Sequence, residues 1–424
     1  MIPISFDEVV ALGLGRFEGR DRDGPITGIK ADSREVRPGD LFVALNTGVA
    51  HIDEARARGA ATLVPDDQEA ALAALASLVR SKSEARVVAI VGSAGKTSTK
   101  DILAALSAPH AATVWPEKSL NNEIGLPLTV CRLEPETEIL ITEMGMRGLG
   151  QVAALSAIAR PDIAVVSHIG PEHLELLGTV ERVAEANAEV IAALPVGGTA
   201  VVPAKSAELE PFLTRSDIEL RRFDAADTEL DHGRGRFRID GRTVELELPF
   251  TQRHHALNTL AALHAYAALG LSLDRASAGA SGIRLSPWRG EEIPLPGGGF
   301  VVNDAYNANP DSMRAALEHL AERAGARRRV AVLGEMAELG DASQRYHREI
   351  GELVHELEIE VIAVGGPARE YGPAVWVSDV EGVVGAARAL LRPGDAVLVK
   401  ASRAVGLEGI AAKITKIAGA WSQS

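Results

Sequence analysis

The sequence predicts an α/β protein of three domains, with a parallel sheet in the second and a Rossmann-like sheet in the third. Two observations predict the sheets: strand-like and helix-like segments alternate from about residue 85 and again from about residue 287. The third observation is the length, because 424 residues exceed what one hydrophobic core usually encloses. We place the domains at residues 1–84, 85–286 and 287–424.

The first domain combines two apolar runs with two helical patterns. Strands are predicted at residues 41–45 and 62–64, and helices at residues 53–59 and 69–80. The polar stretch at residues 81–84 predicts the junction with the second domain.

The second domain alternates strands and helices, which is typical of a parallel sheet with crossover connections. Its predicted strands are residues 87–91, 139–142, 163–167 and 199–202, and its predicted helices are residues 97–106, 150–159, 180–194 and 256–269. Residues 209–250 contain short alternating runs that predict an antiparallel appendage.

The third domain repeats the alternation. Its predicted strands are residues 300–303, 330–333, 361–364 and 396–399, and its predicted helices are residues 311–324, 343–357 and 380–391. The pattern favours a second α/β domain of the Rossmann-like kind.

The composition excludes several classes of protein. A formal charge of -14 argues against a nucleic-acid partner, and no apolar stretch approaches the roughly 18–20 residues of a membrane span. The single cysteine, Cys131, cannot form an internal disulfide and fits a reducing compartment. We predict a cytoplasmic protein in which Cys131 is a small buried side chain rather than a nucleophile.

The strongest functional signal is a glycine-containing loop directly after the strand at residues 87–91. Its residues are Gly92, Ser93, Ala94, Gly95, Lys96, Thr97 and Ser98, and a helix follows. In such loops backbone N–H groups and the helix N-terminus surround a phosphate, the lysine reaches the terminal phosphates, and the threonine hydroxyl can join a Mg²⁺ shell. The loop therefore predicts binding of a nucleoside triphosphate.

Polar side chains also follow the next two strands of this sheet. Glu143 ends one strand, where a carboxylate is placed to bind the Mg²⁺ of a nucleotide; a solvated loop acid is the alternative. His168 and His173 follow the other strand. A single loop histidine is usually a hydrogen-bonded side chain, but two at one sheet edge favour His173 as a ligand or proton carrier.

Two polar segments follow strands of the third domain. Residues 303–310 offer a carboxylate for a ribose (Asp304), an aromatic face (Tyr306) and amides, although Asp and Asn also cap helices. Lys400 and Arg403 place two cations past another strand end, where anions bind; a surface charge pair is the alternative.

Taken together, these motifs resemble the Mur ligase family over nearly the whole chain. The resemblance rests on the phosphate loop and on residues 32–34, 38–44, 121–129, 143–145, 173–175, 254–258, 304–310, 333–340 and 399–403. The short loop form Gly-x-x-Gly-Lys-Thr is that of this family. The resemblance implies three domains: one for the UDP-sugar end of the substrate, a central ATPase domain, and a C-terminal domain that closes over the nucleotide.

The resemblance implies an ATP-dependent amide ligase of peptidoglycan precursor synthesis that acts as a monomer. ATP would convert the terminal carboxylate of UDP-N-acetylmuramoyl-tripeptide into an acyl phosphate, because a free carboxylate is a poor electrophile. The amine of D-alanyl-D-alanine would then attack, giving an amide, ADP and phosphate.

The resemblance also implies roles for individual residues. Lys96 would neutralise charge on the γ-phosphoryl group, Thr97 and Glu143 would hold one Mg²⁺, and His173 would help to hold a second. The implied nucleotide-binding residues are Gly92, Ser93, Ala94, Gly95, Lys96, Thr97, Ser98, Asn258, Arg289, Asp304, Tyr306 and Asn307. The implied substrate-binding residues are Asp32, Ser33 and Arg34 at the uridine diphosphate end, and Asn121, Asn122, Lys400 and Ser402.

The chain departs from the family pattern at Asn187. Mur ligases of this type usually carry there a lysine modified to a carbamate, which steadies the second Mg²⁺. On a helix, Glu185 and Glu189 point about 160° away from Asn187, so neither acid substitutes locally. We expect Asn187 to take part in catalysis with a small anion, chloride or bicarbonate, beside it.

A second departure is the short segment at residues 46–51, where the family usually has a longer loop near the UDP-sugar site. Two alternatives stay open. The chain could be a related ligase that acts on a different carboxylate, or a nucleotide-binding partner protein that has lost catalysis.

Overall fold

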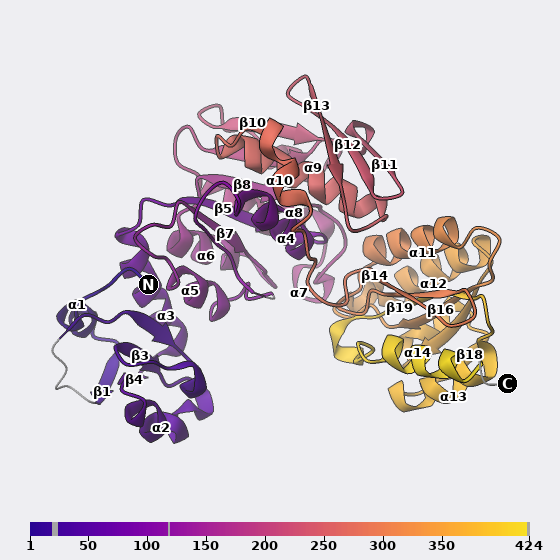
Figure 1. Cartoon of the computed structure of the whole chain (residues 1–424), viewed down its shortest axis with the longest axis horizontal. Helices are drawn as coiled ribbons and strands as arrows, with labels where there is room; N and C mark the ends of the chain where they lie inside the picture. The colour runs from indigo at the N-terminus through magenta and orange to yellow at the C-terminus, as the bar shows by residue number, and fades with distance from the viewer. Residues whose placement is uncertain (19–23, 118, 422–424) are drawn as a thin grey trace.

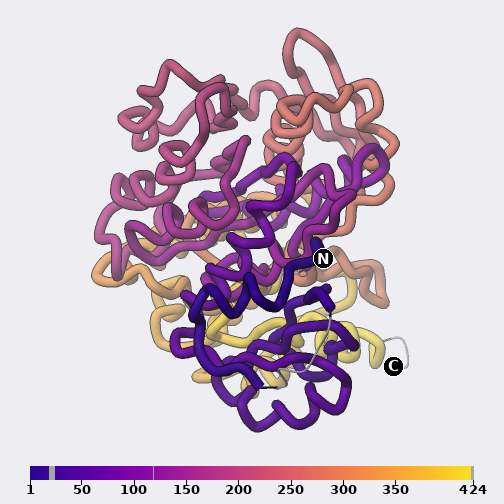
Figure 2. Tube along the Cα trace, turned by 90° about the vertical axis from the view of Figure 1, so that its left-hand side faces the viewer, coloured from indigo at the N-terminus to yellow at the C-terminus, as the bar shows by residue number. Residues whose placement is uncertain are grey.

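The computed structural model describes residues 1–18, 24–117 and 119–421. These residues form four β-sheets in three lobes, with the first lobe and the third on either side of the central one in Figure 1. Figure 2, seen from the side, places the central lobe above the other two. Among the described residues, no helix is both long enough and apolar enough to cross a membrane.

The first lobe contains a four-stranded sheet in the order β1-β4-β3-β2. Its strands are β1 (Gly15–Glu18), β2 (Gly28–Lys30), β3 (Asp40–Val43) and β4 (Ala61–Pro65), and its helices are α1 (Phe6–Ala11), α2 (Ile52–Ala57) and α3 (Gln68–Ser81). The two predicted strands and two predicted helices are confirmed. The short segment after β3 is a 3-10 helix over Asn46–His51.

The central sheet has six parallel strands in the order β10-β9-β8-β5-β7-β6. They are β5 (Arg86–Val91), β6 (Thr113–Val114), β7 (Ile139–Glu143), β8 (Ile163–Val166), β9 (Thr199–Pro203) and β10 (Glu219–Phe223). The helices of this lobe are α4 (Lys96–Ser107), α5 (Gly125–Val130), α6 (Gln151–Ala159), α7 (Leu174–Leu177), α8 (Val180–Ala192), α9 (Arg253–Ala268) and α10 (Ser277–Ala280). The predicted parallel sheet is confirmed.

Strand β5 lies in the middle of this sheet and is covered on both faces. Val87, Ala89 and Val91 belong to an apolar cluster with side chains of α6 and α8, whereas Val88 and Ile90 belong to a separate cluster with side chains of α4 and α9. Side chains of a strand alternate between faces, so a strand covered on both faces is an unbroken apolar run. The buried strand therefore fixes the position at which the phosphate loop begins.

The prediction for residues 209–250 is wrong in part. Strand β10 pairs in parallel with β9 and extends the central sheet. Only β11 (Thr228–Asp231), β12 (Arg234–Ile239) and β13 (Arg242–Glu247) form an antiparallel sheet. Because β10 is an edge strand and Phe223 is its only fully buried residue, its sequence lacks the apolar run of an inner strand.

The third lobe has a six-stranded sheet in the order β14-β15-β19-β16-β17-β18, in which only β14 is antiparallel to its neighbour. Its strands are β14 (Glu291–Pro294), β15 (Phe300–Asn303), β16 (Arg329–Gly334), β17 (Ile359–Val364), β18 (Val375–Val377) and β19 (Ala396–Lys400). Its helices are α11 (Pro310–Ala324), α12 (Ser343–Glu356), α13 (Val380–Leu390) and α14 (Ile410–Trp421), which the prediction lacked. Helices α11 and α12 cover one face of the sheet, and α13 and α14 cover the other (Figure 1).

Cys131 is buried, as predicted, and burial raises the pKa of its thiol to about 12. A thiol with so high a pKa is not ionised near neutral pH and is not a nucleophile.

Candidate active site

The phosphate loop connects β5 to α4, and a neighbouring side chain lies close to one of its glycines. Gly95 precedes α4 in the left-handed region, with φ of 83°. A Cβ atom at Gly95 would lie 2.4 Å from Oδ1 of Asn258, which projects from α9. The loop therefore requires glycine here, and Asn258 lies directly against it.

Lys96 and Thr97 begin α4. The Lys96 ammonium donates to the backbone carbonyl of Gly92 and lies 3.8 Å from Oε2 of Glu172. Thr97 is buried, and its hydroxyl accepts a hydrogen bond from Nη2 of Arg289 at 2.7 Å. The phosphate loop thus has one positively charged side chain close by at the start of α4, Lys96. A second, Arg289, reaches it from the start of the third lobe.

Glu143 ends β7 beside Ile90, at the level where β5 enters the phosphate loop. Only 1% of Glu143 is exposed, and its Oε1 accepts a hydrogen bond from the Asn121 amide at 2.7 Å. Its Oε2 is buried with no hydrogen-bond partner. A buried carboxylate oxygen without a partner is costly, and carboxylate and hydroxyl oxygens are what Mg²⁺ prefers, so these residues fit a magnesium ion.

The described residues contain no group of three His, Cys, Asp or Glu side chains placed to hold a metal ion. A magnesium ion usually keeps several waters and takes phosphate oxygens beside one or two carboxylates. The site therefore fits an ion that arrives with a nucleotide rather than one caged by the protein.

His173 connects the central lobe to the third. Its backbone is left-handed, with φ of 50°, and its Nδ1 hydrogen-bonds to Oε2 of Glu338. Since a carboxylate only accepts, Nδ1 carries the proton. Nε2 then faces Glu172, whose Oε2 is 3.7 Å away. Glu338 also pairs with Arg147 of the central lobe at 3.3 Å.

In the third lobe, Asp304 and Lys400 form an ion pair of 2.5 Å, and the Lys400 ammonium also donates to the carbonyl of Asn307 at 2.9 Å. Lys400 is only 2% exposed, so its charge is neutralised where little water reaches it. The Arg289 guanidinium stacks on the Tyr306 ring, 4.0 Å from its centre. Arg289 therefore links Thr97 of the central lobe to Tyr306 of the third.

Two histidines of α9 lie at the same junction. Burial lowers the pKa of His255 well below its usual value and the pKa of His254 to about 4. Both side chains are neutral near pH 7, and Nε2 of His255 lies 3.3 Å from the backbone carbonyl of Arg289.

Comparison with known proteins identifies this arrangement. Residues 90–266 match the Mur ligase middle domain, and residues 288–403 match the Mur ligase glutamate ligase domain. The UDP-N-acetylmuramoyl-tripeptide--D-alanyl-D-alanine ligase of Escherichia coli (strain K12) is 31% identical, over 97% of this chain and 98% of that protein. The chain belongs to the Mur ligase family.

Solved structures agree. MurF from Acinetobacter baumannii is similar with a TM-score of 0.86 and 26% identity, over 98% of this chain and 99% of that one. The MurF ligase from Thermotoga maritima, solved in complex with ADP, has a TM-score of 0.81 and 28% identity over 93% and 98% of the two chains. The family resemblance and the fold class predicted from the sequence of this Mur ligase are both confirmed.

Some residues predicted to bind substrate have other partners in this Mur ligase. The Asn121 amide donates to Glu143, Asn122 accepts from the Gly125 N–H at the start of α5, and the Ser402 hydroxyl accepts from the Ala337 N–H. In the first lobe Asp32 pairs with Arg34, which lowers the pKa of the Asp32 carboxyl, and Ser33 donates to Glu54.

Asn187 is buried in α8, where its amide donates to the backbone carbonyl of Val183 at 2.9 Å. The Glu189 carboxylate points away from Asn187 and accepts hydrogen bonds from the N–H groups of Gly150 and Ala153 at the start of α6. One N–H of the Asn187 amide is thus used within its own helix.

Glu172 and Glu338 have no role among the predictions from the sequence. Glu172 lies beside both Lys96 and His173, and its place next to His173 after a strand was a usable signal. Glu338 lies 165 residues from His173 in the chain, so only the packing of the lobes brings the two together.

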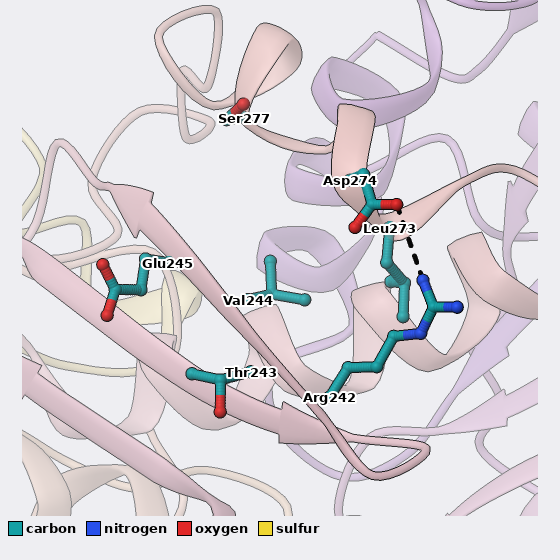
Figure 3. Close-up of a pocket in the computed structure, with 7 residues that line it drawn as sticks. All are labelled: Arg242, Thr243, Val244, Glu245, Leu273, Asp274 and Ser277. Atoms are coloured by element: carbon teal, nitrogen blue, oxygen red, sulfur yellow. Dashed lines mark ion pairs between the residues drawn. The ribbon is translucent and has the colours of Figure 1, made fainter.

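A pocket elsewhere in this Mur ligase contains none of the predicted site residues. It has a volume of about 220 Å³ and lies between β13 and the segment before α10 (Figure 3). Arg242 and Asp274 face each other across it at 3.5 Å.

Proposed function

We propose that this Mur ligase uses ATP to join D-alanyl-D-alanine to UDP-N-acetylmuramoyl-tripeptide in peptidoglycan precursor synthesis. The relatives that match it over nearly their whole length carry this activity in their names. The observation that carries the proposal is the Arg289 bridge, from Thr97 beside the phosphate loop to Tyr306. It joins both sets of predicted nucleotide-binding residues at one junction between lobes.

The proposed chemistry follows from the side chains at this junction. The loop N–H groups and the Lys96 ammonium would hold the triphosphate, with Lys96 neutralising charge as the γ-phosphoryl group moves. A carboxylate oxygen of the tripeptide attacks the γ-phosphorus, and the bond to the ADP oxygen breaks. The dipeptide amine then attacks the acyl phosphate, loses a proton and expels phosphate.

Magnesium completes the proposed site. Thr97 and Glu143 would hold one ion, and His173 would help to hold a second through Nε2, since its Nδ1 is bonded to Glu338. The ions supply neutralising charge for the phosphates.

The lobes have separate proposed roles. Residues 1–84 would bind the UDP-sugar end, residues 85–286 ATP, and residues 287–424 would close over the nucleotide and bind the dipeptide. Asn258 would contact the adenine, and Asp304 the ribose. We propose a monomeric enzyme of the cytoplasm, which accords with its lone buried cysteine.

The test of the reaction is phosphate release from ATP by the full chain. We expect release only when both UDP-N-acetylmuramoyl-tripeptide and D-alanyl-D-alanine are present, with the amide product detected by mass spectrometry. Release with a different carboxylate acceptor would instead indicate a related ligase. No release with any acceptor would indicate a nucleotide-binding partner protein.

Asp304→Ala is expected to raise the KM for ATP about tenfold or more, because a hydrogen bond to a charged group is lost. The KM for the UDP-peptide should change little. Asp304→Asn keeps the side-chain shape and an oxygen that can accept from a ribose hydroxyl, but it removes the charge that neutralises Lys400. A KM for ATP as high as that of Asp304→Ala would therefore assign the effect to the ion pair. Equal increases in both KM values would assign Asp304 a structural role.

We also propose that a small anion lies beside Asn187, held by the N–H that its helix does not use. Activity should fall in buffer free of halide and bicarbonate and return when chloride is added. Asn187→Leu, of similar size, should remove this response. Activity independent of both anions would contradict the proposal.

A further inference from the structure

The first residues of α11, in the third lobe, lie directly on the phosphate loop. Asn309 precedes this helix and is only 6% exposed. Its Oδ1 accepts from the Ser312 N–H at 2.9 Å, which caps the helix, while its Nδ2 donates to the backbone carbonyl of Ser93 at 3.1 Å. One amide therefore both caps a helix of the third lobe and contacts the loop of the central lobe.

A second contact lies two residues further along the chain. Oδ2 of Asp311 is 2.8 Å from Nε2 of His168, and both side chains are about 40% exposed. This pair also crosses from the third lobe to the central lobe. The approach is close at Gly170, where a Cβ atom would lie 1.9 Å from Oδ2 of Asp311.

The segment that Asp311 meets is bonded to the phosphate loop. The Ser93 hydroxyl donates to the carbonyl of Gly170 and accepts from its N–H, both at 3.0 Å. The Ser93 N–H donates to the carbonyl of His168 at 2.7 Å. A displacement of the loop would therefore move both surfaces on which the start of α11 rests.

We infer that Asn309 and Asp311 are positioning residues that seat the third lobe on the phosphate loop, and that Gly170 leaves the space that Asp311 needs. The inference rests on the proposed function, because seating brings Asp304 and Lys400 towards the nucleotide. Neither Asn309 nor Asp311 needs to touch the nucleotide. Each acts through Ser93 or His168.

Asn309→Asp tests the contact without removing the helix cap. A carboxylate still accepts the Ser312 N–H and suits a helix N-terminus, but it cannot donate to the Ser93 carbonyl and repels it. We expect the KM for ATP to rise about tenfold, with kcat at saturating ATP within about twofold of the parent and an unchanged thermal midpoint.

Asp311→Ala should raise the KM for ATP about fivefold, and Asp311→Asn, which can still hydrogen-bond to His168, should restore most of it. Glu318→Ala is the matched control, since it removes an exposed carboxylate from the same helix.

Gly170→Ala should resemble Asp311→Ala. In the double variant the alanine at position 170 should add little, because the carboxylate it would displace is absent and only the 2.9 Å approach of its Cβ atom to Nε2 of the His168 side chain is left.

Seating is measured directly by fluorescence energy transfer between dyes on Glu136→Cys and Glu381→Cys, in the central and third lobes. The one native cysteine is buried, which favours labelling at the introduced positions. The structure holds the contacts of Asn309 and Asp311 already made, so the parent should show high transfer and Asn309→Asp should lower it. The β,γ-imido analogue of ATP with Mg²⁺ should restore transfer in the variant. Gly385→Ala, which has open space around it, is the control for the glycine variant.

Unchanged transfer curves and an unchanged KM for ATP in both Asn309→Asp and Asp311→Ala would overturn the inference. Additive rather than redundant effects of Gly170→Ala and Asp311→Ala would overturn the role of Gly170. A parent that seats through Asn309 but releases no phosphate with the two proposed substrates would contradict only the proposed function.

Discussion

Lys96→Ala is expected to lower kcat by at least about a thousandfold, because a positioned cation on the transferring phosphoryl group supplies several kcal/mol of transition-state stabilisation. The measurement is phosphate release at saturating ATP and both proposed substrates. The folded protein should keep its thermal midpoint, since the ammonium makes one backbone hydrogen bond and one ion contact of 3.8 Å.

Lys413→Ala, which removes an exposed lysine of α14, is the matched control and should leave kcat unchanged. A substantial residual rate in Lys96→Ala would remove Lys96 from the γ-phosphoryl group. The nucleotide affinity of the variant, measured by calorimetry, separates a loss of binding from a loss of chemistry.

Glu143→Gln is expected to lower activity about a hundredfold at fixed Mg²⁺ and to raise the Mg²⁺ concentration needed for half-maximal rate. Glutamine keeps an oxygen to accept from Asn121, but it removes the charge on a buried side chain whose second oxygen has no partner. The variant without nucleotide should be as stable as the parent or more stable, because an uncompensated buried charge is removed.

The two readouts move in opposite directions, which distinguishes a metal-binding role from a structural one. Glu136→Gln, in the exposed loop before the same strand, is the control. If Glu143→Gln lowers the midpoint of unfolding and leaves the Mg²⁺ dependence unchanged, Glu143 holds the sheet together rather than a metal ion.

Local sequence was sufficient for the phosphate loop and for both large sheets. Strand β5 is an apolar run that ends in a glycine turn, and this pattern is decided within about a dozen residues. Strand β10 was not predicted as part of the parallel sheet, because an edge strand needs little apolar surface. Helix α14 was not predicted, although its buried Ile410, Ile414 and Ile417 follow helical spacing.

The contacts between lobes could not be read from the sequence. The bonds from Glu338 to His173 and from Asn309 to Ser93 span 165 and 216 residues. No local pattern encodes which side chain meets which across such a separation. Substrate binding by Asn121 stays a prediction, and its hydrogen bond to the carboxylate of Glu143, 22 residues away, was not predicted.

Helix α3 belongs to the first lobe by chain order, yet it packs against α5 and α6 of the next. Leu72, Leu75 and Val79 are fully buried there. In a truncated chain that starts at residue 85, the apolar surface of α5 and α6 that α3 covers would be exposed to water. Such a chain would be prone to aggregate. The first lobe therefore shares its hydrophobic core with the central lobe, and we expect the central lobe to need α3 in order to stay folded and dispersed.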